Sequence, residues 1–324
     1  MIIKYITDKW LALITISALV LTSNVHADPV TSIAIDVGYR TDDVKWSIAG
    51  FFEGQYVNLL SELSWDNLKI QQIRISLDHT SKKSIVAASV SYGSIVSGSN
   101  QDSDYKGSNK TLEFSRSNNN SGGDDVVDFE IGFGYEIDLY NSKSIHTAHL
   151  IPLFGYSYHE QNLRMTDGFQ TVSRPELVLP QNAPVALGPF TDVLNSTYQT
   201  QWDGLWLGIQ LLFGNTTEGG RYSLLFKHHW PDYYAEANWN LRPEFAHPKS
   251  FSHQSNGTGN EFLMQWIGNT SEAWALKVML QYQKWSTTPG IDIIYYSDGT
   301  AAATRLNGVE WQSTTFMLGV EVRI

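Results

Sequence analysis

Two aspartates separated by one residue are the clearest candidates for chemistry in this sequence. Asp102 and Asp104 lie in a polar stretch, Gly98 to Tyr105, that follows an alternating apolar segment. Two carboxylates this close do not ionise independently, so they could share a proton and orient a water molecule. The same pair could instead bind a hard cation such as Ca²⁺, or do no more than solvate a loop.

Histidines that could act as a general base are found near a second polar stretch, from Asp232 to Gly257. A histidine beside a carboxylate is the basic unit of general base catalysis. His229 and His247 are the candidate catalytic partners of the aspartates, and His253 is a further one. The candidate substrate-binding residues in the same stretch are Glu236, Trp239 and Arg242. Phosphate loops, zinc motifs and nucleophile elbows are absent from the sequence, so we expect no metal site and no cofactor.

The segment from Val127 to Leu139 indicates which kind of element positions these residues. Its apolar residues alternate without a break with Asp128, Glu130, Gly132, Gly134, Glu136 and Asp138. A period of two places the apolar residues on one face of a β-strand. So many carboxylates on the other face are typical of a wall between lipid and a wet lumen, as in a transmembrane β-barrel. A long exposed strand of a soluble sheet is the alternative.

Nine further segments alternate in the same way, which makes ten strands. An even number is typical of a closed bacterial barrel, so we predict an all-β fold, a ten-stranded antiparallel transmembrane β-barrel. A register change is expected near Asn67. The ten predicted strands are 33–52, 57–77, 86–92, 127–139, 148–158, 205–213, 222–230, 262–266, 274–282 and 316–324.

The connections between these segments alternate between short and long. The short ones lie near 82–83, 141–144, 215–219 and 269–272, and the long polar ones at 97–125, 166–195, 232–257 and 285–307. Short periplasmic turns and long extracellular loops are the rule in such barrels. This phase places both chain termini on the periplasmic side. It also places Asp102 and Asp104 in an extracellular loop, outside the hydrogen-bonded wall.

The first 27 residues have the pattern of a secretory signal peptide. Lys4 and Lys9 accompany an apolar run from Trp10 to Leu21, and Val25-His26-Ala27 has the form of a cleavage site. The run is too short for a transmembrane helix, although a retained N-terminal anchor is the alternative. We therefore predict a signal peptide at residues 1–27 and a single barrel domain at residues 28–324.

Composition supports a location in the outer membrane. The chain has 11 Trp and 16 Tyr, and such rings collect at membrane interfaces. A net charge of −11 argues against nucleic acid as a partner and leaves basic peptides open. The expected partners are outer-membrane lipid, lipopolysaccharide and a basic peptide or protein substrate, and we expect a monomer.

Charged and polar residues on the inward faces of the predicted strands indicate a filled lumen. The set comprises Asp128, Glu130, Glu136, His149, Gln210 and Lys227. Mixed charges at this density should pair across a narrow barrel, so we expect little or no ion conductance. A small porin is the alternative.

The layout and several short patterns resemble the omptin family of outer-membrane proteases. The similarity rests on ten strands, the D-x-D at Asp102 and Asp104, and the strand patterns Glu62-Leu63-Ser64-Trp65, Gly155-Tyr156-Ser157-Tyr158 and Phe226-Lys227 before Trp230. The resemblance implies a surface endopeptidase that activates a water molecule and cleaves next to basic residues. By this resemblance, Asp102 and Asp104 would form the first catalytic pair.

The second omptin pair, an aspartate and a histidine, has no match in this sequence. Alignment on Trp230 places Ala237 and Trp239 at those positions, and the stretch 235–240 contains no histidine. Another histidine must then take the role, or the general base is missing. The alternative function is a non-catalytic surface barrel that binds a peptide, a glycan or lipopolysaccharide. A histidine facing the aspartates across the cleft would favour the enzyme, and an aromatic wall led by Trp239 would favour the binding protein.

Overall fold

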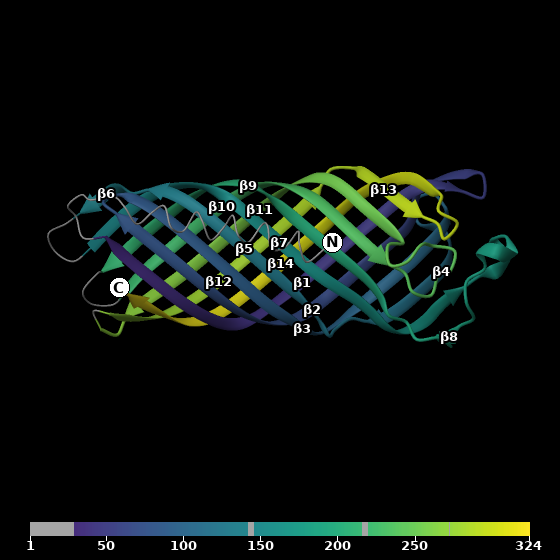
Figure 1. Cartoon of the computed structure of the whole chain (residues 1–324), viewed down its shortest axis with the longest axis horizontal. Helices are drawn as coiled ribbons and strands as arrows, with labels where there is room; N and C mark the ends of the chain where they lie inside the picture. Colours follow the sequence, from purple (N-terminus) through teal and green to yellow (C-terminus); the bar gives the residue numbers. More distant parts are fainter. Residues whose placement is uncertain (1–28, 142–145, 216–219, 272) are drawn as a thin grey trace.

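The computed structural model describes residues 29–324, except 142–145, 216–219 and 272, and consists mainly of long β-strands (Figure 1). The predicted signal peptide, 1–27, lies outside the described residues, as do parts of the predicted turns at 141–144, 215–219 and 269–272. Within the described part of the chain, no helix has the length and apolar character needed to cross a membrane.

The described residues form fourteen strands and two short 3₁₀ helices. The strands are β1 Val30–Phe52, β2 Gln55–Ser81, β3 Ser84–Gly107, β4 Thr111–Asn120, β5 Asp124–Tyr135, β6 Ile137–Asn141, β7 His146–Ser173, β8 Gly188–Pro189, β9 Ser196–Asn215, β10 Gly220–Asn238, β11 Phe251–Asn269, β12 Trp274–Thr287, β13 Gly290–Tyr295 and β14 Ala301–Arg323. The helices are η1 Pro175–Leu177 and η2 Pro180–Asn182.

The strands close into a ring. The antiparallel order β1-β2-β3-β5-β7-β9-β10-β11-β12-β14 returns to β1, because β14 pairs with β1 along its length. Strand β4 pairs with the same two neighbours as β5, namely β3 and β7, so it extends the same place in the wall. Thr31 and Ile324 exchange backbone hydrogen bonds, which brings the two ends of the described chain together. The predicted ten-stranded antiparallel barrel is confirmed.

Rows of apolar side chains cover the outside of one part of the wall. Ile35, Val37 and Tyr39 of β1 are more than half exposed, whereas Asp36 and Arg40 on the inner face are buried. A soluble protein rarely exposes apolar rows of this kind, and in a bilayer lipid covers them. This lipid-facing belt includes residues 33–39, 73–77, 86–92, 127–139, 150–158, 205–213, 222–230, 262–266, 274–282 and 316–322.

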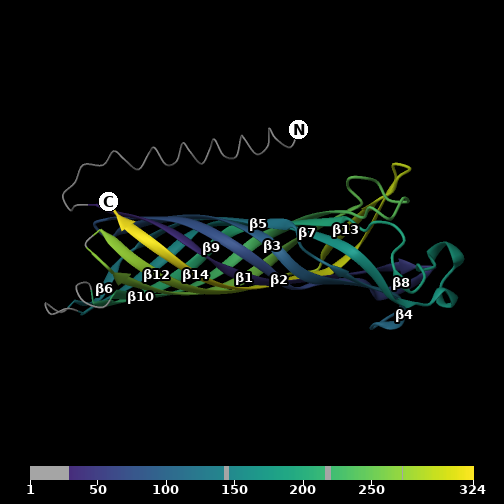
Figure 2. The same ribbon diagram turned by 90° about the horizontal axis from the view of Figure 1, so that it is seen from below.

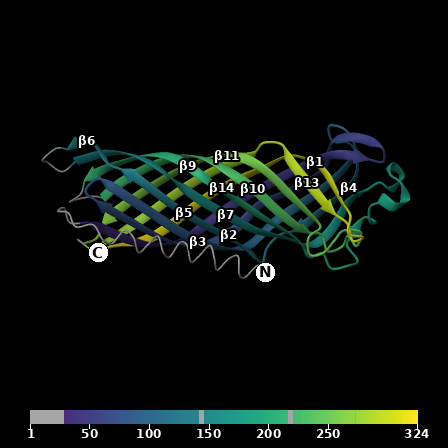
Figure 3. The same cartoon turned by 45° about the horizontal axis from the view of Figure 1, so that its top comes forward.

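The strands continue well beyond this belt on the side opposite the C-terminus, where β4, β8 and β13 lie (Figures 2 and 3). Much of what the sequence predicts as loop is therefore strand. Asp102 and Asp104 lie within the ladder of β3, between β2 and β4, and not in a loop as predicted. The outer faces here meet water instead of lipid, so the apolar alternation disappears from the sequence although the hydrogen-bonded ladder continues.

A β-bulge in β2 accounts for the predicted register change. Trp65 and Leu68 are both fully buried although they are an odd number of positions apart, three, and the pairing shifts between Asp66 and Lys69. Asn67 takes a positive φ of 56° there, and its N–H donates to Asp43 Oδ1 at 2.7 Å. The extra residue changes which alternate residues face inward, so that apolar residues point into the barrel on both sides of the bulge.

The interior of the extension beyond the belt is a packed aromatic core. Trp65, Trp202 and Trp285 have no exposed surface. We call this group the aromatic cluster; its large members are Trp46, Trp65, Tyr198, Trp202, Tyr233, Trp239, Phe251, Trp285 and Trp311. The end of the barrel opposite the C-terminus, which the sequence predicts to be extracellular, is thus filled by side chains.

Candidate functional site

Asp102 and Asp104 point into the extracellular end of the barrel. In the antiparallel ladder Asp102 lies opposite Leu63 of β2, and Asp104 lies opposite Ser61. Opposed residues share a face, and Leu63 is buried in the interior, so both carboxylates face inward. On the other side, β4 places Ser117 opposite Asp102. The predicted pair is therefore on one face of one strand, among serines.

The negative charges of the two carboxylates are poorly compensated by hydrogen bonds and cations. Asp102 Oδ1 is shielded from solvent and has no hydrogen-bond partner among the described residues. Burial and the neighbouring charge of Asp104 raise the pKa of Asp102 well above its usual range. Burial also raises the pKa of Asp104, although the positive charge of Arg242 and hydrogen bonds from Ser61 and Ser115 act in the opposite direction. These shifts favour a pair that holds a proton.

Neither candidate histidine contacts this pair in the described part of the chain. His229 is buried in the lumen, where Nδ1 is 3.1 Å from the Ser157 hydroxyl and Nε2 is 3.5 Å from Glu261 Oε2. His247 is exposed, and its Nδ1 is 2.7 Å from Asn238 Oδ1. His229 therefore lies among the charged groups of the lumen and not beside the aspartates.

A buried histidine–carboxylate pair does exist near the aromatic cluster. His253 Nε2 is 3.4 Å from Asp292 Oδ1, and its Nδ1 is 2.8 Å from the Tyr198 hydroxyl. Both residues of the pair are almost fully buried, and the Trp46 ring lies 4.8 Å from the imidazole. Asp292 was not found by sequence reasoning, because β13 lies in a segment predicted to be a loop and carries no recognisable motif.

Aromatic rings connect the inner face of β2 with His253. Trp65 shares the inner face of β2 with Leu63, the residue opposite Asp102. It stacks on Tyr198, with centroids 5.2 Å apart and planes 12° apart, and Tyr198 in turn binds His253. His253 is therefore linked to Trp65 through the ring of Tyr198.

The candidate substrate-binding residues lie in three different environments. Trp239 is buried in the aromatic cluster, with its ring 4.7 Å from Phe251. Arg242 is exposed, pairs with Glu244 at 2.5 Å, and is close enough to act on the charges of Asp102 and Asp104.

Glu236 belongs to the outer face of β10, because Ala235 and Ala237 beside it are buried inside. It pairs with Lys249 at 2.6 Å. Burial acts to raise the pKa of Glu236, but hydrogen bonds from Lys249 and Tyr234 outweigh it and lower that pKa. This residue and the aspartate pair do not form one site.

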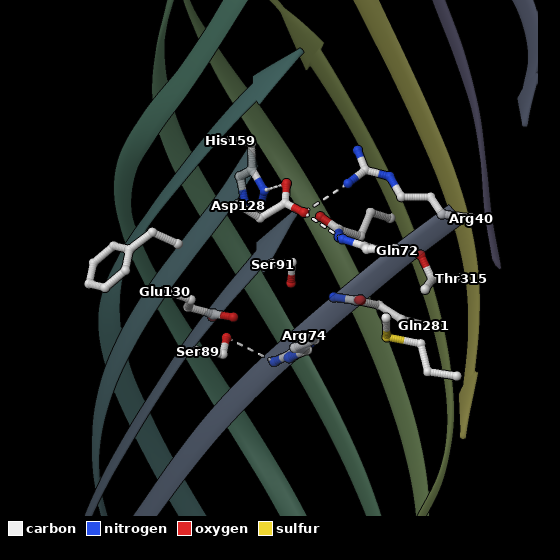
Figure 4. A pocket seen from close by; sticks show the side chains of 13 residues that line it. Arg40, Gln72, Arg74, Ser89, Ser91, Asp128, Glu130, His159, Gln281 and Thr315 are labelled. Atoms are coloured by element: carbon white, nitrogen blue, oxygen red, sulfur yellow. Dashed lines mark hydrogen bonds and ion pairs between the residues drawn. The ribbon is translucent and has the colours of Figure 1, made fainter. Parts of the chain in front are cut away.

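The lumen at the level of the belt holds a dense charge network around Arg40 (Figure 4). Arg40 binds Asp42 through two hydrogen bonds of 2.7 and 2.6 Å and binds Asp128 at 2.8 Å. His159 Nδ1 is 2.9 Å from the other oxygen of Asp128, and Gln72 donates to Asp128 at 2.9 Å. Arg40, Gln72, Asp128 and His159 line a small cavity of about 20 Å³.

Further ion pairs fill the lumen on the side of this network that is nearer the C-terminus. Lys227 pairs with Glu130 and, at 3.0 Å, with Glu261. Lys277 pairs with Asp36 at 3.1 Å. A second cavity of about 90 Å³ lies beside Lys227 and Lys277. The predicted pairing of inward charges across the barrel is confirmed.

The family of the chain follows from its sequence. Residues 34–324 match the family described as "Pom: Protochlamydia outer membrane protein". The chain belongs to the Protochlamydia outer membrane protein family. The predicted location in the outer membrane is confirmed by this match and by the barrel fold. A comparison with curated protein sequences finds no match.

Solved structures resemble the barrel with little sequence identity. The crystal structure of the outer membrane protease OmpT from Escherichia coli aligns with a TM-score of 0.68 and 15% identity, covering 94% of this chain and 99% of that one. The translocator domain of the autotransporter NalP from Neisseria meningitidis aligns with a TM-score of 0.35 and 10% identity, covering 98% and 96%. The OmpT likeness extends to the fold alone, so the predicted resemblance to omptins holds at the level of architecture.

Proposed function

We propose that this outer-membrane barrel is a surface-binding protein that does not hydrolyse peptides. The observation that carries the proposal is that no described histidine contacts Asp102 or Asp104, while His253 is bound within the aromatic cluster. A general base must reach the attacking water directly, at about 2.6–3.2 Å, or through one further water. Here the imidazole of His253 contacts Tyr198, which stacks on Trp65. Among the described residues, the aspartates therefore lack the facing histidine that a water-activating site of this type requires.

The binding surface that we propose is an apolar projection at the extracellular end. It consists of the β1–β2 hairpin, residues 51–56, and the segment between β7 and β9, residues 174–195, and we call it the extracellular knob (Figures 1 and 2). Phe51, Leu187 and Val193 are 77%, 65% and 83% exposed. Exposed apolar groups of this kind, outside the lipid-facing belt, are typical of protein-binding surfaces.

Specific contacts hold the knob in one conformation. Glu53 accepts hydrogen bonds from the Leu179 N–H at 2.6 Å and from the Asn182 amide at 3.0 Å. Lys106 joins the two parts, because it binds Glu53 at 2.9 Å and the Leu177 carbonyl at 2.6 Å. A surface ordered in advance loses less conformational entropy on binding. These features support recognition of an apolar surface on a polypeptide.

The test combines cleavage with selection of ligands. The full mature barrel, refolded with lipopolysaccharide, should leave a peptide with adjacent lysine and arginine residues intact over hours. A random peptide phage library should yield apolar or aromatic binders that are lost on the variant Phe51→Ser with Val193→Ser. Cleavage of the dibasic peptide, or selected binders that retain full affinity for the double variant, would refute the proposal.

One observation favours the endopeptidase as a second candidate. The aspartate pair is present on the inner face, with a partner-free oxygen on Asp102 and a raised pKa at both carboxylates. If the enzyme is active, Asp102→Asn should remove most cleavage, since general acid–base assistance contributes about 10²–10⁴ in rate. His253→Gln tests whether the buried pair takes part, because it should leave the rate unchanged if the aromatic cluster isolates it.

A further inference from the structure

A histidine and two carboxylates converge at the opposite, periplasmic mouth of the barrel. Asp138 of β6 lies directly opposite His149 of β7, and Glu136 lies between β5 and β6. His149 Nδ1 is 3.1 Å from Glu136 Oε1 and 3.0 Å from Asp138 Oδ1. One donor atom from each of the three residues lies within 4.8 Å of the others. Strand β6 is at the end where the C-terminus lies (Figure 1).

These separations suit a transition-metal ion. Zn²⁺ binds imidazole nitrogen at about 2.0–2.1 Å and carboxylate oxygen at about 2.0–2.2 Å, so tetrahedral geometry separates neighbouring donors by roughly 3.3 Å. The imidazole already stands close to that distance from both carboxylates. The remaining adjustment falls on Glu136 and Asp138, whose side chains are 22% and 40% exposed and have room to move.

The surroundings leave the donor atoms available. Lys83 binds Asp138 through Oδ2 at 2.8 Å, and Oδ1 is the atom that faces His149. An ion coordinated by Oδ1 would therefore have a carboxylate whose second oxygen is already held in place, as in many metal sites. The His149 side chain is 13% exposed, so the site is open to the periplasm while the ring keeps a defined orientation.

We propose that Glu136, Asp138 and His149 form a binding site for a divalent transition-metal ion of the zinc type, with the fourth position left to water. An imidazole with two carboxylates suits Zn²⁺ and similar ions better than Mg²⁺ or Ca²⁺, which prefer oxygen ligands alone. The ion would connect the start of β6 with β7 at the rim of the barrel. This site is independent of the extracellular surface and of the proposed function.

The test uses the full mature chain without an affinity tag, refolded in detergent. Zn²⁺ titration should give one site per chain, and Co²⁺ should give the strong visible absorption of a four-coordinate ion. His149→Gln should weaken Zn²⁺ binding by at least about 100-fold, the upper end of the loss seen even for residues that only orient a ligand. Asp138→Asn should also weaken it, and this second variant carries the test if the first does not fold.

His79→Gln is the matched control, because its ring contacts the Thr31 hydroxyl at the same end of the barrel and takes no part in the site. Its affinity for Zn²⁺ should equal that of the parent. The proposal is wrong if the parent binds no ion in the micromolar range, if His149→Gln binds Zn²⁺ as tightly as the parent, or if His79→Gln loses affinity to the same extent. Heat-modifiable gel migration confirms that each variant is a folded barrel.

Discussion

Replacing Arg40 by methionine should destabilise the barrel far more than replacing another cation of the same strand. Arg40 and Asp42 are 2% and 0% exposed, and Arg40 also pairs with Asp128. Removal of one partner from a buried ion pair costs about 3–5 kcal/mol, because it leaves an uncompensated charge in the interior. Arg40→Met leaves two such carboxylates, so we expect a loss at the upper part of that range.

Lys45→Met is the matched control, because Lys45 lies on the outer face of the same strand. Its side chain is 47% exposed, and it pairs with Glu62 at 3.1 Å. Solvent screens such a pair, so its loss should cost no more than about 1 kcal/mol. The two variants remove one positive charge each from β1, and they differ mainly in burial.

Urea unfolding of the barrel in lipid or detergent provides the measurement. Tryptophan fluorescence reports on unfolding, and one of the contributing rings, Trp311, lies 5.4 Å from the Arg40 guanidinium and donates its N–H to Asp42 at 3.1 Å. The triple variant Arg40→Met, Asp42→Asn, Asp128→Asn should recover much of the lost stability, since no buried charge is left unpaired. Equal midpoints for Arg40→Met and Lys45→Met would refute the view that this network holds the lumen together.

Three further predictions concern the lumen, the aspartates and the knob. The parent protein should show little or no single-channel current in planar bilayers, because paired charges fill its lumen, and a large steady current would identify a porin. The raised pKa of Asp102 stabilises the fold only while the group is protonated, so this contribution is present below the usual aspartate pKa and is lost as pH rises through the higher folded value. Asp102→Asn should therefore flatten the fall in the unfolding midpoint between acidic and neutral pH. Parallel pH profiles for the parent and the variant would contradict this. Hydrogen bonds from Leu179 and its neighbours lower the pKa of Glu53 to about 2, so its contribution is present above the usual glutamate pKa and disappears as pH falls towards 2. Glu53→Gln should make residues 174–195 more sensitive to limited proteolysis at neutral pH, whereas Glu176→Gln, an exposed change in the same segment, should not.

The wall of the barrel could be predicted from the sequence because its signal is local. Lipid on one side and a polar interior on the other impose a period of two, which Val127 to Leu139 carries without a break. The bulge at Asn67 could also be located, because inward apolar residues change parity there between Trp65 and Leu68. The ends of the strands could not, because polar residues that face water give no alternating signal.

Tertiary structure alone decided which groups meet in the interior. Alternation predicts that Asp128 and Lys227 face inward, and only the register across the wall brings Arg40 to Asp128, 88 positions away, and Lys277 to Asp36, 241 positions away. The pairing of His253 with Asp292 could not be predicted for the same reason, because it depends on the pairing of β11 with β13. Sequence alone thus determined the two faces of each strand, because a face depends on near neighbours. Closure of the ring determined the contents of the lumen, because those contacts depend on the tilt and stagger of all ten strands together.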